Sequence, residues 1–223
     1  MSSPGNVFLK TANDNDQDVD VPPSLILHNI INCFSMNGKE YEIPVIQFIL
    51  EENRNEPEVL DAFVEDLFNK SLADKSFSSV AVDLIVWLIK NVQDGERYRN
   101  DFLTRLRKVY LEKNFKQLNV WLGCVSMLTH STCKILLPVP GGVCFIKALV
   151  DNCFEAMLTC FREEASDEEV ECAVSLLTAS FEVFKKEKEP QDLQKLLDQI
   201  QRSRTNTSRS AIIDKFIQRC NLQ

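Results

Sequence analysis

A group of basic residues in the middle of the chain is the part of the sequence best suited to binding a ligand. Seven cations lie between residues 97 and 116, opposed only by Asp101 and Glu112, which gives this basic segment a net charge of +5. The 223-residue chain as a whole has a formal net charge of -8. A positive ridge on a negative protein suits RNA phosphates or an acidic partner, and a solvated helix face is an equally weighted interpretation. The candidate binding residues are Arg97, Arg99, Arg105, Arg107, Lys108, Lys113 and Lys116.

Other charged groups lie on both sides of this segment. Acidic residues gather in two runs, 51–66 and 163–171, at helix starts and on polar helix faces, where acids complement the helix dipole. A solvated surface is the favoured interpretation of these runs, and a functional one would contact a basic protein. The C-terminal segment adds five cations: Arg202, Arg204, Arg209, Lys215 and Arg219.

Catalytic and metal chemistry has few candidates. His28 and His130 are the two histidines, and the six glycines form no phosphate-binding loop. Cys124, His130 and Cys133 are close in sequence, but the chain lacks the Cys-x-x-Cys pairs and spacings typical of zinc sites. We therefore expect a protein that is not an enzyme and that uses no cofactor or metal.

The cysteines and the apolar segments indicate a compartment. The chain begins without a secretory signal, and no apolar run approaches the ~20 residues of a membrane-spanning helix. Most of the eight cysteines sit among apolar residues, so they are better interpreted as reduced, buried thiols than as disulfides. These features predict a protein that resides in the cytoplasm, with the nucleus as a further candidate location, and that does not bind membranes.

Helical periodicity dominates the rest of the chain. Residues 1–21 are polar and acidic, which predicts a disordered leader, and residues 22–223 are expected to form one helical-repeat domain. Pairs of amphipathic helices in series favour an all-α fold, an α-solenoid of about five antiparallel helix pairs. The segment 131–142 is expected to be a loop whose apolar middle tucks against the core. The ten expected helices are about 24–34, 41–52, 57–68, 76–91, 96–112, 116–130, 143–162, 167–184, 190–200 and 208–217.

Several helix starts are marked by capping residues. Asn55 precedes Pro57 and Glu58, which predicts that Asn55 caps the third helix. Ser166 with Glu169 forms a capping box for the eighth helix. Pro44 suits the first turn of the second helix, which places the start of that helix near Tyr41.

The sequences of three helices resemble one family. Residues 98–106, Tyr-Arg-Asn-Asp-Phe-Leu-Thr-Arg-Leu, are similar to the F-R-x-x-L-L-x-R helix in the middle domain of eukaryotic translation initiation factor four-G. Residues 121–125, Trp-Leu-Gly-Cys-Val, occupy the place of its F-L-G-E-L helix, without the acid. Residues 169–177, Glu-Val-Glu-Cys-Ala-Val-Ser-Leu-Leu, resemble its x-I-E-C-A-V-K-L-L helix most specifically. The order agrees across about residues 24–222.

The resemblance implies a HEAT-like fold and a role as an adaptor. The chain looks nearest to the short, single-domain members of the family, such as partners of poly(A)-binding protein or of the histone stem-loop-binding protein. It implies a non-enzymatic regulator of mRNA translation or stability. The implied partners are translation initiation factors or a DEAD-box helicase, mRNA-binding proteins, and RNA itself as a further candidate. The alternative hypothesis is a helical-repeat interaction scaffold unrelated to RNA.

Overall fold

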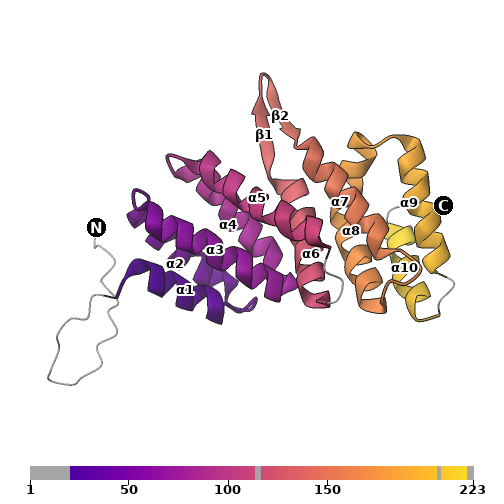
Figure 1. Cartoon of the computed structure of the whole chain (residues 1–223), viewed down its shortest axis with the longest axis horizontal. Coiled ribbons are helices and arrows are strands. Elements are labelled where there is room, and N and C mark those ends of the chain that lie inside the picture. Colours follow the sequence, from indigo (N-terminus) through magenta and orange to yellow (C-terminus); the bar gives the residue numbers. More distant parts are fainter. Residues whose placement is uncertain (1–20, 114–116, 205–206, 220–223) are drawn as a thin grey trace, which may run out of the picture.

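The chain is almost entirely helical in the computed structural model, which describes residues 21–113, 117–204 and 207–219 (Figure 1). These residues form ten α-helices, the number that the periodicity predicts. A short 3-10 turn, Lys75–Phe77, precedes the fourth helix. The predicted leader, apart from Val21, lies outside the described residues. The helices are α1 Pro23–Cys33, α2 Lys39–Glu52, α3 Pro57–Ala73, α4 Ser78–Asn91, α5 Gly95–Glu112, α6 Leu118–Lys134, α7 Lys147–Cys160, α8 Asp167–Glu187, α9 Pro190–Ser203 and α10 Thr207–Arg219.

Alternate helices form a continuous row through most of the molecule. Helix α4 packs on α6, α6 packs on α8, and α8 packs on α10. At the N-terminal end, α1 packs on α3, and α3 in turn packs on α6. The chain therefore advances along the long axis of the molecule from α1 and α2 at one end to α9 and α10 at the other (Figure 1).

Helix α6 is the centre of the core. Every residue from Trp121 to Thr129 is buried, and the helix contacts α3, α4, α5, α7 and α8. Trp121 is only 2% exposed and stacks on Tyr110 of α5, so it belongs to the core. A Cβ atom at Gly123 would lie 2.5 Å from the carbonyl oxygen of Ser71 in α3. Glycine is therefore what permits the close approach of the two helix backbones.

The connection between α6 and α7 is a β-hairpin, which corrects the predicted loop over 131–142. Helix α6 continues to Lys134, and the strands β1 Leu136–Val139 and β2 Gly142–Phe145 then pair in an antiparallel register from Leu136↔Phe145 to Val139↔Gly142. Gly141 supplies the positive φ of 90° in the turn. Ile135 is buried, as expected, but the hairpin projects from the row of helices (Figure 1).

The helix starts agree with the predicted caps in one of three cases. Ser166 Oγ accepts a hydrogen bond from the Glu169 N–H at 3.2 Å, and Glu169 returns one to the Ser166 N–H at 2.8 Å, so the capping box is confirmed. The Asn55 cap is wrong, because Glu56 is the N-cap of α3 and its side chain makes no capping bond. Helix α2 begins at Lys39, which places Pro44 inside the helix rather than in its first turn.

The start of the last helix is only partly described. Residues 205 and 206, just before α10, lie outside the described residues.

The contact at Gly123 gives a test of the core. Gly123→Ala is expected to lower the free energy of unfolding by about 1–3 kcal/mol, because the added methyl group must push α3 and α6 apart. Gly142→Ala in the hairpin is the matched control, since no atom lies within 4 Å of its added Cβ. Urea unfolding measures both variants, and equal losses in the two would contradict the close contact.

Candidate interaction surface

The predicted basic segment lies mainly on α5, and one of its residues is buried. Arg99 shares the inner face of the helix with Tyr98 and Phe102 and is only 9% exposed. Its Nε donates to Asn100 Oδ1 at 3.3 Å, and its guanidinium lies 3.8 Å from Glu96. Arg99 is therefore not presented at the surface, contrary to the prediction.

Two other arginines of the segment already have acidic partners. Arg97 binds Asp61 of α3 at 2.5 Å, and Arg105 binds Asp101 of α5 at 2.9 Å. Arg105 also lies 4.0 Å from Glu65 of α3. Exposed ion pairs such as these add little stability, but they lower the local positive charge that a ligand would meet. The acidic run at 51–66 thus faces part of the basic segment.

The remaining cations of the segment face solvent. Arg107, Lys108 and Lys113 are exposed, and no ion pair joins Arg107 or Lys108 to an acid within the described ranges. Lys113 ends α5 with a left-handed φ of 41°. Lys116 lies outside the described residues. Besides the paired Arg97, the exposed cations of this segment in the described residues are therefore Arg107, Lys108 and Lys113, and we call this set of three the α5 basic face.

Stacking of bases is not supported at this face. The neighbouring rings of Tyr98 and Tyr110 are both buried, and the Tyr110 ring lies against Trp121. Base stacking on aromatic rings is the usual source of affinity for single strands beyond phosphate contacts. Contacts at the α5 basic face would therefore be electrostatic.

A second group of basic residues meets at a pocket at the C-terminal end. The pocket, about 540 Å³ in volume, lies where the α7–α8 turn meets the end of α9 and the start of α10. Its lining includes Arg202 and Arg209, two of the five cations of the C-terminal segment. It also includes Arg162, which the sequence did not indicate as a binding residue. Arg204, by contrast, pairs with Asp214 at 2.8 Å. The lining residues are Phe161, Arg162, Glu163, Gln199, Arg202, Ser203 and Arg209.

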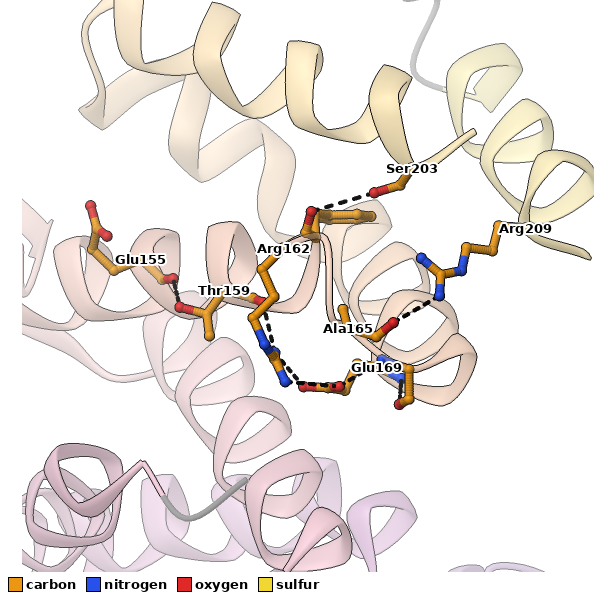
Figure 2. A network of polar contacts seen from close by, with 9 residues as sticks. Glu155, Thr159, Arg162, Ala165, Glu169, Ser203 and Arg209 are labelled. Atoms are coloured by element: carbon orange, nitrogen blue, oxygen red, sulfur yellow. Dashed lines mark hydrogen bonds and ion pairs between the residues drawn. The ribbon is translucent and has the colours of Figure 1, made fainter. Parts of the chain in front are cut away.

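Two of these arginines serve the packing of the α7–α8 turn, as Figure 2 shows. Arg162 forms a forked ion pair with the buried Glu169, with N–O distances of 2.6 and 3.2 Å, and also donates to the Thr159 carbonyl. Arg209 of α10 donates to Asp167 at 2.6 Å and to the Ala165 carbonyl at 2.7 Å. Both guanidinium groups are thus held by acceptors of the turn, and we interpret them as structural.

The candidate metal residues are not brought together. Cys124 is buried in α6, His130 lies one to two turns further on, and the described residues hold no group of three His, Cys, Asp or Glu side chains placed to bind a metal. Burial and the Lys134 ammonium lower the pKa of His130 to about 4, while Asp83 acts in the opposite direction. At neutral pH the imidazole is therefore uncharged.

The described cysteines form no disulfide, and two of them are exposed although buried thiols were expected. All seven described cysteines are free thiols, and Cys33 and Cys144 are exposed. Burial raises the pKa of Cys124 and Cys153 to about 12, so these thiols stay protonated at neutral pH. Cys220 lies outside the described residues. None of the described helices combines the length and apolarity needed to cross a membrane.

Comparison with protein-family models finds no match, and comparison with curated proteins finds no significant match.

His130 predicts a pH dependence of stability. Because its pKa is about 4 in the folded protein and 6.5 in its ordinary state, the unfolded chain binds more protons between these values, and stability falls as pH drops from 6.5 to 4. NMR titration of the imidazole, assigned with a His28→Gln variant, should give a midpoint near 4. A midpoint near 6.5 would show that His130 is not desolvated.

A substitution of Glu169 tests the structural role of its ion pair with Arg162. Glu169→Gln is expected to lower the free energy of unfolding by about 1.5–3 kcal/mol, because it weakens the charged hydrogen bonds to Arg162. Glu168→Gln, an exposed neighbour in the same turn, should change stability by less than about 0.5 kcal/mol. Thermal or urea unfolding compares the two, and an unaffected Glu169→Gln protein would contradict this role.

Proposed function

We propose that this chain is a non-enzymatic adaptor that regulates mRNA translation or stability, with a HEAT-like α-solenoid of about five antiparallel helix pairs. The observation that carries the proposal is the continuous row of alternate helices α4, α6, α8 and α10, which produces an extended surface. Extended surfaces of this kind are used by helical-repeat proteins to bind other macromolecules. The resemblance of residues 98–106 and 169–177 to the translation-factor family supplies the link to mRNA.

The contact surface in this proposal is the α5 basic face. Its cations are exposed, whereas Arg97 and Arg105 are offset by Asp61, Glu65 and Asp101. On a protein of net charge -8, this face is suited to RNA phosphates or to an acidic surface of a translation initiation factor or DEAD-box helicase. Other mRNA-binding proteins are further candidate partners.

The proposal assigns no catalytic role to the chain. An activated nucleophile needs a lowered pKa or an adjacent general base. The buried thiols have raised pKa values, and neither Cys124 nor Cys153 hydrogen-bonds a histidine in the described structure. These features support binding rather than chemistry.

A helical-repeat scaffold unrelated to RNA is the second candidate function. The neutralisation of Arg97, Arg105 and Arg209 by carboxylates favours it, because each such pair removes a cation from the surface that RNA would meet. The two functions differ in their dependence on salt and on the α5 basic face.

The double variant Arg107→Glu with Lys108→Glu tests the proposed surface. We expect it to weaken binding of a fluorescently labelled single-stranded RNA by roughly tenfold or more and to reduce the salt dependence of binding, because two phosphate contacts are lost. Fluorescence anisotropy at several salt concentrations measures both quantities. Lys186→Glu with Lys195→Glu, at exposed positions on α8 and α9, is a control with the same change in net charge.

Two results would overturn the RNA contact. One is an equal loss in the two double variants, which would reflect net charge alone. The other is the absence of salt-sensitive RNA binding by the unaltered protein. Recovery of translation initiation factors or a helicase from nuclease-treated cytoplasmic extract, lost in the Arg107→Glu, Lys108→Glu protein, would support an acidic protein partner at the same face.

A further inference from the structure

Helix α2 carries an apolar stripe on its outer face. Tyr41, Val45 and Phe48 are 78%, 49% and 66% exposed, and their spacing of four and three residues places them along one side of the helix. The opposite side of the helix is fully buried through Ile46 and Leu50. Helix α2 is therefore apolar on two faces, and only one of them is covered.

The position of α2 leaves this stripe accessible. Helix α2 packs mainly on α1, and both lie at the N-terminal end of the row of helices (Figure 1). The end element of a helical stack needs a polar outer face to remain soluble without a partner. An end helix that exposes two aromatic side chains is, by contrast, typical of an interaction surface, because exposed apolar patches mark such sites.

The stripe is bordered by negative charge. Helical geometry places Glu40 and Glu51 along one edge of the stripe and Glu52 at its C-terminal end, and all three are exposed. Arg54 offsets one of these acids, since it pairs with Glu51 at 2.9 Å. Residues 39–58 contain six acids and two cations, a net charge of -4. A ligand for this face must therefore combine an apolar surface with positive charge.

We propose that the α2 stripe docks an amphipathic helix of a partner protein whose apolar face is flanked by lysine or arginine. The Tyr41 and Phe48 side chains would pack against the apolar face of that helix. Glu40 and Glu52 would pair with its lysine or arginine side chains. This inference does not depend on the α5 basic face, which would bind ligands of the opposite charge.

Charge disfavours the other possible occupants. A second copy of the chain would bring two 39–58 segments of net charge -4 together, and like charges across an interface oppose association. Residues 1–20 carry Asp14, Asp16, Asp18 and Asp20 against Lys10, so this segment is also acidic. RNA is repelled for the same reason.

The test uses the full chain and two synthetic peptides of about 18 residues, long enough to form an amphipathic helix. The first has a leucine face flanked by lysines, and the second is identical except that glutamate replaces every lysine. Fluorescence anisotropy of the labelled peptides measures affinity. We expect the lysine peptide to bind, with an affinity that falls as salt rises, and the glutamate peptide not to bind.

Substitutions on the protein show where the lysine peptide binds. Tyr41→Ser with Phe48→Ser should weaken binding of the lysine peptide by roughly tenfold or more, because it removes the two aromatic anchors. Leu111→Ser is the matched control: Leu111 is 63% exposed on α5, away from the α2 stripe. Arg107→Glu with Lys108→Glu should leave peptide binding unweakened, which separates this result from the test of the proposed function. Circular dichroism checks that each variant keeps its helical content.

Four results would overturn the proposal. Equal binding of the two peptides would remove the role of charge, and unchanged binding by the Tyr41→Ser, Phe48→Ser protein would remove the stripe. Concentration-dependent dimers in sedimentation equilibrium that Phe48→Ser abolishes would assign the stripe to a second copy. Tighter peptide binding after Phe8→Ser with Leu9→Ser would assign it to the chain's own N-terminal segment.

Discussion

The close approach of α3 and α6 at Gly123 is the constraint on which the rest of the structure depends. With no side chain at this position, the backbone of α6 reaches Ser71 and Leu72 of α3. Helix α6 also contacts α4, α5, α7 and α8, so the same helix joins the N-terminal elements to the row that runs to α10. The orientation of α5 follows from this arrangement, because Tyr110 of α5 packs on Trp121 of α6 and turns the α5 basic face outward.

Ion pairing then decides which charges a ligand can meet. Carboxylates of α3 and α5 hold Arg97 and Arg105, and carboxylates at the start of α8 hold Arg162 and Arg209. The protein has more acids than bases, so most of its clustered cations find a partner within the fold. Among the exposed charges of the described residues are a small positive face on α5 and a negative border around the apolar stripe of α2.

Local sequence rules predicted the helical segments and one of three marked helix starts, but not the start of α2 or the cap of α3. The Ser166–Glu169 capping box and the helical segments follow from contacts three or four residues apart. The hairpin was missed because its apolar residues 135–137 fit a buried loop equally well. The acidic partner of Arg97 lies 36 positions away on α3, and Arg209 meets the α7–α8 turn across more than 40 positions, so no periodicity could reveal either contact. The exposed stripe of α2 was missed because apolar spacing does not show which of two apolar faces the fold covers.

Most helices pack on others that are close in the sequence, an arrangement of low contact order that favours fast folding. The contact between Ser71 and Gly123 joins residues about fifty positions apart, and the bond from Lys134 of α6 to Ser79 of α4 spans a similar separation. During synthesis at roughly 5–20 residues per second, α3 emerges from the ribosome about 3–10 s before the segment of α6 that covers it. The surface of α3 that receives α6 is consequently open for seconds in each nascent chain, and a chaperone could bind it during translation.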